Sequence, residues 1–299
     1  MLDKLAHAIA QPARAAIRAA DTDALRIADG AGDGFKDLIV DDFAGHWLVE
    51  TRGPFPDWLK DAPQPESIHW KQLGGSESPQ WTCGVRQEEP FVVSENGLKY
   101  WIDFASGYSQ GIFLDQRDNR LALRKMAAGK TVLNTFAYTC AFGVSAAMGG
   151  GETVNLDLSK RYLEWGKRNY ALNGLSAAAP HDFIYGDTME WLKRFRKKGR
   201  KFDIILIDPP TFSRNEKGAV FTIESGFTPL VREAAALLNA GGTLFCSTNQ
   251  RSLAGADFRY LITDGLDDPQ KWELRSAPMP ADFSGEQYLK ANWVTLRAL

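Results

Sequence analysis

The chain lacks a long apolar run, a surplus of charge of either sign, and closely spaced cysteines. No stretch approaches the ~20 apolar residues of a membrane-spanning helix, so we expect no membrane association. The 35 basic and 37 acidic residues give a formal charge of −2, so any surface that binds nucleic acid must be local. The three cysteines, Cys83, Cys140 and Cys246, lie far apart and match no metal-ligand spacing. We therefore expect no metal ion and a reducing, cytoplasmic location.

The first 103 residues predict a helix followed by a small, mostly β domain. Residues 1–20 are Ala-rich and amphipathic, which favours a helix. Short strands are expected at Leu38–Val40 and Trp47–Glu50, and a hairpin is expected around residues 95–97. Residues 54–79 are rich in Pro, Gly, Ser and Gln and are expected to be irregular.

Residues 104–299 alternate between strand-like and helix-like segments, a pattern typical of a parallel, doubly wound sheet. The last two strand-like segments, Trp272–Ser276 and Trp293–Leu296, are too close in sequence for a helical crossover and are expected to pair antiparallel. The sequence thus predicts an α/β fold with a Rossmann-like, mostly parallel sheet and an antiparallel edge strand. The expected strands before this pair are 131–136, 153–156, 183–185, 202–207 and 243–247, with helices near 142–148, 159–173 and 227–238.

Chemistry is expected where the apolar strand Phe202–Ile207 ends. Asp208 follows it directly, and Pro209 and Pro210 then prevent strand or helix from continuing. Phe212 lies two residues further along the same loop. Alone, this segment is also compatible with an ordinary turn. Its place after a buried strand favours function, because open parallel sheets bind ligands at the carboxyl ends of their strands.

Acidic residues also follow the two preceding strands. Asp157, after the second strand, is placed to accept both hydroxyls of a ribose, and Asp187, after the third, can reach an adenine edge. Aspartate is common wherever a strand ends, so each position alone is weak evidence. Together with Asp-Pro-Pro they indicate a nucleotide cofactor. The loop after the first strand, NTFAYTCAFGVSAA, lacks the glycine fingerprint of dinucleotide-binding proteins, which counts against NAD.

Four segments together resemble the RlmI/RlmK-like ribosomal RNA large-subunit methyltransferases, and DPPTFS also resembles the fourth motif of methyltransferases that act on nitrogen. The segments are GIFLDQRDNR, the loop NTFAYTC, DLSKRYLEWGKRNYALNGL and DPPTFS. One departure is Cys140, which stands where the family usually has glycine and must adopt the backbone that the loop requires. The resemblance implies S-adenosylmethionine as cofactor, with contacts from Gln110, Phe113, Asp115, Arg117, Asn134, Phe136, Tyr138, Asp157, Leu158, Asp187 and Asp208.

The resemblance also implies methylation of an RNA base, by one of two mechanisms. Relatives that methylate cytosine C5 use a cysteine from a Phe-Ser-Cys-Ser loop after the fifth strand. Here that loop is FCSTNQR, which leaves Cys246 in the strand and puts Thr248 at the nucleophile position. The loop better resembles the guanine-N7 branch, with Asn249 and Arg251 matched. We therefore expect nitrogen methylation of RNA, with guanine N7 in ribosomal RNA favoured. The expected catalytic residues are Asp208, Pro209, Pro210, Phe212 and Asn249.

The sequence leaves several alternatives open. The segment Trp191–Lys201 carries seven basic residues and is either a phosphate-binding face or an ordinary solvated helix face. A methyltransferase of a protein or of a small planar amine would share Asp-Pro-Pro-Phe without needing a basic surface. A non-catalytic module that binds S-adenosylmethionine or RNA is a further alternative. The expected domains are 1–103 and 104–299, and no feature indicates an oligomeric state.

Overall fold

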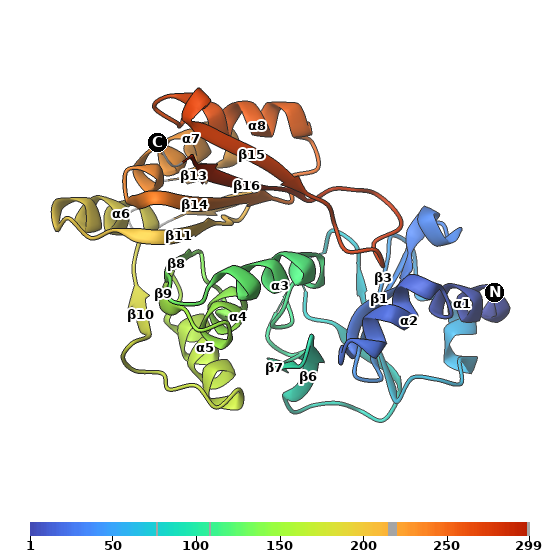
Figure 1. The fold of residues 1–299 in the computed structure, drawn as a ribbon. Helices are drawn as coiled ribbons and strands as arrows, with labels where there is room; N and C mark the ends of the chain where they lie inside the picture. Colours follow the sequence, from blue (N-terminus) through green and yellow to red (C-terminus); the bar gives the residue numbers. More distant parts are fainter. Residues whose placement is uncertain (76, 108, 215–219, 298–299) are drawn as a thin grey trace. The chain divides into compact units, whose positions relative to one another are not determined.

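The computed structural model describes residues 1–75, 77–107, 109–214 and 220–297 (Figure 1). Its contacts divide the chain into two compact units. The first comprises Met1–Asp118 together with Met279–Gln287, and the second comprises Asn119–Pro278 together with Tyr288–Leu299. The division into domains 1–103 and 104–299 stays a prediction.

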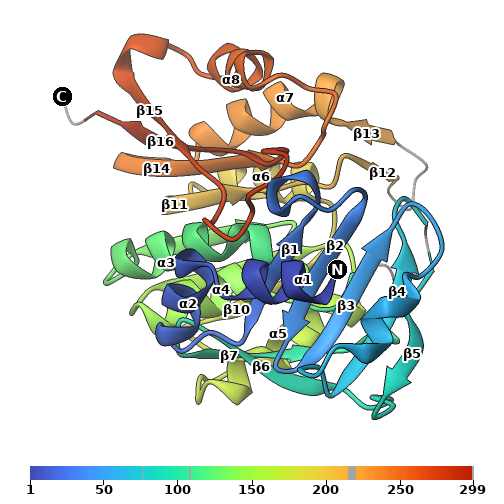
Figure 2. The same ribbon diagram turned by 90° about the vertical axis from the view of Figure 1, so that its right-hand side faces the viewer.

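The first unit is built on a five-stranded sheet with the order β1-β2-β3-β4-β5 (Figure 2). Neighbouring strands are antiparallel except β3 and β4, which are parallel. The predicted N-terminal helix is two helices, because Pro12 occupies the first turn of the second one. The elements are α1 (Leu2–Ile9), α2 (Pro12–Ala19), β1 (Ala24–Asp29), β2 (Leu38–Phe43), β3 (His46–Thr51), β4 (Ser67–Gln72), β5 (Gln80–Gly84) and the hairpin β6 (Phe91–Glu95) and β7 (Leu98–Ile102), with short 3₁₀ turns at Gly30–Asp33, Asp57–Asp61 and Leu114–Gln116.

The predictions for this unit were correct for its hairpins and wrong for residues 54–79. The pairs β2–β3 and β6–β7 form as expected, and β2 and β3 are longer than predicted. Within 54–79, however, β4 is a strand. Its sequence, SIHWKQ, is largely polar, so its strand character depends on β3 and β5 on either side rather than on its own composition.

The second unit has a seven-stranded sheet with the order β10-β9-β8-β11-β14-β16-β15. The strands β10, β9, β8, β11 and β14 are mutually parallel, which confirms the predicted α/β class. The last two strands pair antiparallel as expected, and β16 is the reversed strand, between β14 and β15. The strands are β8 (Thr131–Thr135), β9 (Glu152–Asp157), β10 (Asp182–Tyr185), β11 (Phe202–Ile207), β14 (Leu238–Thr248), β15 (Trp272–Ala277) and β16 (Lys290–Leu296), with a separate hairpin of β12 (Phe212–Arg214) and β13 (Val220–Thr222).

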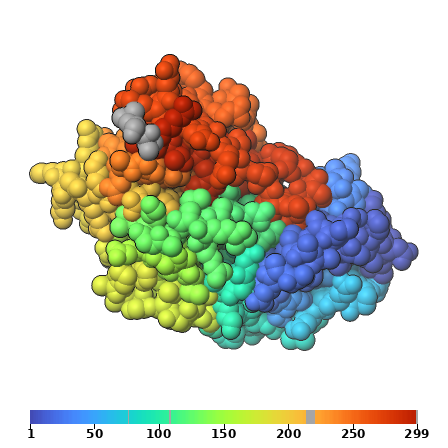
Figure 3. Space-filling model, viewed as in Figure 1, coloured from blue at the N-terminus to red at the C-terminus, as the bar shows by residue number. Residues whose placement is uncertain are grey.

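Helices cover both faces of this sheet (Figure 1). The helices α4 and α5 lie on one face, and α6, α7 and α8 lie on the other. In the space-filling view α6, in yellow, is at the left margin (Figure 3). Among the described residues, no helix has both the length and the apolar character needed to cross a membrane. The helices are α3 (Arg117–Met126), α4 (Ala141–Met148), α5 (Lys160–Leu172), α6 (Thr188–Lys197), α7 (Ile223–Ala235) and α8 (Gly255–Asp264).

In the second unit the predicted start of the strand at 243 was wrong, and one helix was missed. The glycines Gly241 and Gly242 lie inside β14, because the strand starts at Leu238 and its register with β11 shifts there. The helix α8 was not predicted, because its sequence, GADFRYLITD, buries only Phe258 and Ile262. These two buried positions give an apolar stripe that is too short to indicate a helix from the sequence.

Candidate active site

The parallel strands bring the predicted acidic residues to one edge of the sheet. Asp157 ends β9, Asp187 follows β10 after one glycine, and Asp208 follows β11 directly. Because β10, β9, β8 and β11 run in the same direction as neighbours, their carboxyl ends share that edge. The expectation that these strand ends meet is confirmed by the topology.

Asp157 is fixed by backbone donors on both of its oxygens. Tyr138 N donates to Oδ2 and Ser159 N donates to Oδ1, each at 2.8 Å. Burial raises the pKa of Asp157, and the N–H bonds from Tyr138, Ser159 and Leu158 lower it in opposition. A carboxylate oxygen has two lone-pair sites, so each oxygen can accept one further hydroxyl. Two acceptor oxygens arranged in this way fit the two hydroxyl donors of a ribose.

The loop between β8 and α4 curves around Asp157 through three non-glycine residues in the left-handed region. These are Phe136, Tyr138 and Cys140, with φ of 54°, 50° and 59°. The Cys140 side chain is fully buried, and burial raises the pKa of its thiol well above the usual value. Such a backbone costs roughly 1–2 kcal/mol at a non-glycine residue, so Cys140 adopts the conformation that the loop requires at an energetic cost.

Asn134 belongs to a buried polar network. Its amide donates to Asn155 Oδ1 at 3.0 Å, and Asn155 in turn donates to the Tyr170 hydroxyl at 3.0 Å. Gly143 of α4 packs against this network, because a Cβ there would lie 2.0 Å from Asn155 Oδ1. The observed role of the Asn134 amide is therefore to join β8 to β9, and its expected cofactor contact stays a prediction.

Three further residues that were predicted to contact the cofactor differ in their exposure and their partners. Asp187 caps α6 by accepting a hydrogen bond from Glu190 N at 3.0 Å. Leu158 is 37% exposed beside Asp157, which makes it available as an apolar contact. Phe136 is partly buried and packs against the core beneath the sheet. Contacts of all three with a cofactor stay predictions.

Asp208 is oriented by a hydroxyl from the neighbouring strand. Ser247 of β14 donates to Asp208 Oδ1 at 2.5 Å. Pro209 is buried and Pro210 is exposed, so the loop turns outward between them. Sequence reasoning missed this role of Ser247, because the bond joins residues that are 39 positions apart.

Phe212 lies on an exposed face of the β12–β13 hairpin and is itself 59% exposed. In the pairing of these strands Phe212 opposes Thr222, so Phe221 points to the other face. Phe221 approaches Phe136 of the cofactor loop with ring centroids 6.2 Å apart. The hairpin therefore links the loop after β8 to an aromatic ring that is open to solvent.

The loop after β14 carries an exposed Asn249 next to the well-anchored Gln250. Lys290 Nζ donates to Gln250 O at 2.6 Å, and the Gln250 amide donates to Glu224 and to Ser252. Cys246 is fully buried within β14, and burial raises the pKa of its thiol far above its usual value. Thr248 is also fully buried.

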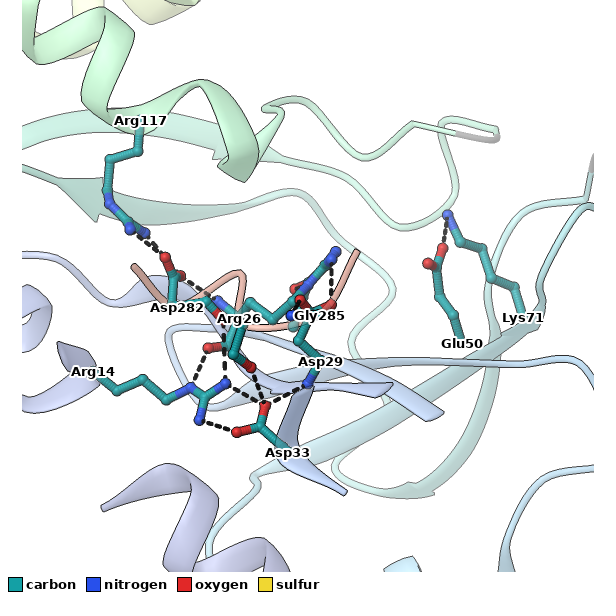
Figure 4. A network of polar contacts seen from close by, with 11 residues as sticks. Arg14, Arg26, Asp29, Asp33, Glu50, Lys71, Arg117, Asp282 and Gly285 are labelled. Carbon is teal, nitrogen blue, oxygen red and sulfur yellow. Dashed lines mark hydrogen bonds and ion pairs between the residues drawn. The ribbon is translucent and has the colours of Figure 1, made fainter. Parts of the chain in front are cut away.

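Four predicted cofactor residues, Gln110, Phe113, Asp115 and Arg117, belong to the first unit. There Arg117 forms a two-pronged ion pair with Asp282, with Nη1 donating to Oδ2 at 3.0 Å (Figure 4). Gln110 Oε1 lies 3.5 Å from Lys71 Nζ. Phe113 is 43% exposed and Asp115 is buried. These observations describe how the residues are held, and their cofactor contacts stay predictions.

The basic segment 191–201 begins in α6. Its Leu192 and Phe195 are buried, and its cations are exposed. Because α6 returns from the carboxyl edge to the start of β11, its last turn lies toward the opposite edge of the sheet. Within the described ranges, no three His, Cys, Asp or Glu side chains gather as metal ligands, and the expected lack of a metal stays a prediction.

Comparisons with known proteins show which family has this fold. A family profile described as S-adenosylmethionine-dependent methyltransferase matches residues 66–272. Ribosomal RNA large subunit methyltransferase K of Neisseria meningitidis is 38% identical, over 86% of this chain and 74% of its own length. YwbD of Bacillus subtilis is 35% identical, over 94% of this chain and 75% of its own. The crystal structure of SMU.776, complexed with S-adenosylhomocysteine, has a TM-score of 0.89 and 29% identity and covers 99% of this chain and 80% of that one.

A mostly parallel sheet with one reversed strand and a carboxylate at the end of its second strand is typical of a class I methyltransferase. The chain belongs to the S-adenosylmethionine-dependent methyltransferase family. It is an enzyme, its methyl donor is S-adenosylmethionine, and the predicted resemblance to the RlmI/RlmK-like proteins is confirmed.

Proposed function

We propose that this enzyme methylates a base nitrogen of ribosomal RNA, with N7 of guanine as the target. The printed name of the Neisseria relative supports the choice of ribosomal RNA. The observation that carries the choice of nitrogen is the hydrogen bond from Ser247 to Asp208, which fixes a carboxylate beside a loop stiffened by two prolines. The neighbouring strand β14 has one thiol, Cys246, and it is buried. These groups can orient a planar base, and they provide no accessible nucleophile.

The cofactor site follows from the loops at the ends of β8, β9 and β10. Asp157 would accept the ribose hydroxyls, Leu158 would contact the adenine, and Tyr138 N would keep the carboxylate in place. Bound S-adenosylmethionine supplies a methyl group already activated on a sulfonium. By resemblance, Gln110, Phe113, Asp115 and Arg117 would contribute further contacts, with Asn134, Phe136 and Asp187.

The substrate base would be held by the DPPTF segment. Asp208 and the carbonyl of Pro209 would accept N–H groups of the base, and Phe212 would stack on it, which is worth roughly 1–3 kcal/mol. Asn249, exposed after β14, would lie at the other side of the base. Fixing the geometry of the reacting atoms can lower a barrier by ~7–11 kcal/mol, so positioning suffices as the main catalytic effect. A base inside RNA must first leave its stack.

Cytosine C5 methylation is the second candidate, because the family resemblance includes it. It requires a thiolate that adds to the ring. Cys246 is fully buried in β14 with a raised pKa, and Thr248 at the expected nucleophile position is buried as well. Neither feature favours a covalent mechanism.

The experiment is transfer of tritiated methyl into an unmodified transcript of large-subunit ribosomal RNA, followed by nucleoside analysis. We expect 7-methylguanosine, and we expect Asp208→Asn to lower kcat about 100-fold or more because the base loses its orienting charge. Asp203→Asn is the matched control, since Asp203 lies at the opposite end of β11 and bonds Thr131 and Asn239.

The other outcomes identify the alternatives. Production of 5-methylcytidine would contradict nitrogen methylation. Transfer into a protein or a small amine, with none into RNA, would replace the substrate class. A third outcome is that the protein binds S-adenosylmethionine but transfers no methyl group. In that case the wild type and Asp208→Asn would give equal background tritium counts on every substrate pool, which would indicate a non-catalytic binding module.

A further inference from the structure

The near-neutral charge of the whole chain conceals opposite charges in its two units. The first unit has 11 Lys and Arg and 21 Asp and Glu, a formal charge of −10. The second has 24 Lys and Arg and 16 Asp and Glu, a formal charge of +8, and together they give the −2 of the chain. An RNA substrate is therefore repelled by the first unit and attracted by the second.

The positive charge of the second unit is itself concentrated in one part of the sequence. Residues 119–201 hold 15 Lys and Arg against 6 Asp and Glu, whereas residues 220–278 hold 5 against 7. The first range supplies α5 and α6, which flank β10, together with α4 and most of α3, and the second supplies α7 and α8. Because β10 pairs with β9 alone, it forms one edge of the sheet.

Among the described residues, several cations lie over aromatic rings along this edge, and three of these pairs involve rings that are only half-buried. Lys160 Nζ lies 4.8 Å from the ring centroid of Tyr185, and Lys167 Nζ lies 5.8 Å from that of Phe183. On α6, the Arg194 guanidinium lies 4.9 Å from the ring of Trp191. All three rings are half-buried, and Lys160 and Arg194 are exposed. In Figure 3 this part of the second unit, in yellow and yellow-green, forms part of the molecular surface.

We propose that this surface, formed by α5, β10 and α6 with the residues up to Lys201 and here named the α5–β10–α6 surface, binds the backbone of the RNA substrate. The inference rests on the proposed function and adds to it a location for phosphate binding away from the reacting base. Cations neutralise phosphates and release counterions, and aromatic rings beside them stack on bases without sequence preference.

The alternative, an ordinary solvated helix face, accounts for only part of the charge. Some cations have acidic partners, since Lys167 bonds Glu164 at 2.6 Å and Arg196 pairs with Glu233 at 3.4 Å. Residues 160–201, which supply α5, β10 and α6, hold 11 Lys and Arg against 4 Asp and Glu, so their own acids leave a surplus of seven cations, one of which is the Arg196 that pairs with Glu233 of α7. A surplus of that size, gathered around one sheet edge, fits a polyanion better than a solvated face.

The test compares two double charge reversals of equal size. In Lys193→Glu/Lys197→Glu the changed residues are exposed and one helical turn apart on α6. In the control, Arg259→Glu/Arg275→Glu, the exposed residues lie on α8 and β15, at the other end of the sheet order. Affinity for the unmodified large-subunit ribosomal RNA transcript is measured by filter binding between about 50 and 200 mM salt.

We expect the α6 variant to bind at least tenfold more weakly and to reduce the slope of log affinity against log salt by about 1.5, corresponding to two lost phosphate contacts. We expect the control to change affinity less than threefold and both variants to keep the wild-type Kd for S-adenosylmethionine. Equal weakening by both variants, or an unchanged slope in the α6 variant, would overturn the proposal.

Two further results separate the proposals from each other. If the wild type neither binds nor methylates ribosomal RNA, the proposed function fails. If it methylates RNA while the α6 variant binds with wild-type affinity, only the α5–β10–α6 surface is wrong. Light scattering tests whether the wild type associates with itself in a salt-sensitive way. If it does, and if the α6 variant loses this self-association while RNA binding is unchanged, the surface binds the acidic unit of a second copy and the proposal is overturned.

Discussion

At the scale of single residues, the site depends on carboxylates that are oriented before any ligand arrives. Asp157 is held by two backbone N–H groups and Asp208 by the Ser247 hydroxyl. Burial raises the pKa of Asp157, so its ionised form is under a desolvation cost that the N–H bonds only offset in part. Such a group would gain strongly from two hydroxyl donors, which is the contact that the proposed ribose site requires.

A buried histidine predicts how stability depends on pH. Burial lowers the pKa of His69 to about 4 from its usual 6.5, with the neighbouring His46 adding to the effect. The unfolded chain therefore binds more protons between these values, so the stability is complete above pH 6.5 and is lost as the pH falls toward 4. We expect a loss of about 2 kcal/mol after allowance for solvent screening.

The measurement is urea unfolding of the wild type and of His69→Phe at several pH values. We expect the wild type to lose stability between pH 6.5 and 4 and the variant to lose about 2 kcal/mol less. His7, which is exposed on α1, provides the control His7→Phe. Parallel pH profiles for the wild type and His69→Phe would contradict the assignment.

At the scale of elements, the cofactor loop is fixed by close packing against α5. A Cβ at Gly166 would lie 2.3 Å from Cys140 Sγ and 2.8 Å from Cys140 Cβ. The side chain of Cys140, whose backbone is left-handed, therefore occupies the space that a side chain at position 166 would need. The larger residue of the pair lies in the loop, and the glycine lies on α5.

This arrangement predicts a compensating pair of substitutions. Gly166→Ala should destabilise the protein by about 1–3 kcal/mol through overpacking, and adding Cys140→Gly should restore most of the loss because the clashing atoms are gone. Thermal unfolding of the two single variants and the double variant measures the coupling. Gly255→Ala is the control, since nothing lies within 4 Å of a Cβ there. Additive effects would show that the two positions are not in contact.

The elements of the parallel sheet could be predicted because their strands are apolar and end at turn residues. Phe202–Ile207 and its Asp-Pro-Pro end are the clearest case. By contrast, β4 could not be predicted, because its polar sequence becomes a strand only between β3 and β5. The same reason explains the missed partner of Asp208, since hydrogen bonds between distant strands leave no local pattern in a sequence.

At the scale of the whole molecule, a segment from late in the chain completes the first unit. Residues 279–287 lie between β15 and β16 in sequence, yet they belong to the first unit. Asp282, whose side chain is fully buried, pairs with Arg117 there and accepts a hydrogen bond from Arg26 N at 2.9 Å (Figure 4). The membership of residues 279–287 in the first unit could not be predicted, and neither could the opposite charges of the units. Both depend on which distant residues share a unit.

Asp282→Ala should therefore destabilise the protein by about 3–5 kcal/mol, because it leaves the buried Arg117 guanidinium without its partner. Replacing both members, as Arg117→Met/Asp282→Leu, should recover much of that loss, since no buried charge remains. Urea unfolding measures all three proteins. A loss below about 1 kcal/mol for Asp282→Ala would show that the ion pair is not a structural requirement of the first unit.

The most direct test of the account is calorimetric titration with S-adenosylmethionine of the wild type and of Asp157→Ala. We predict micromolar binding by the wild type and a loss of at least 100-fold in the variant, because two charge-assisted hydrogen bonds of roughly 1.5–3 kcal/mol each disappear. Equal affinity in both proteins would contradict the assignment of Asp157 as the ribose-binding carboxylate, and with it the cofactor site on which the proposed methyl transfer depends.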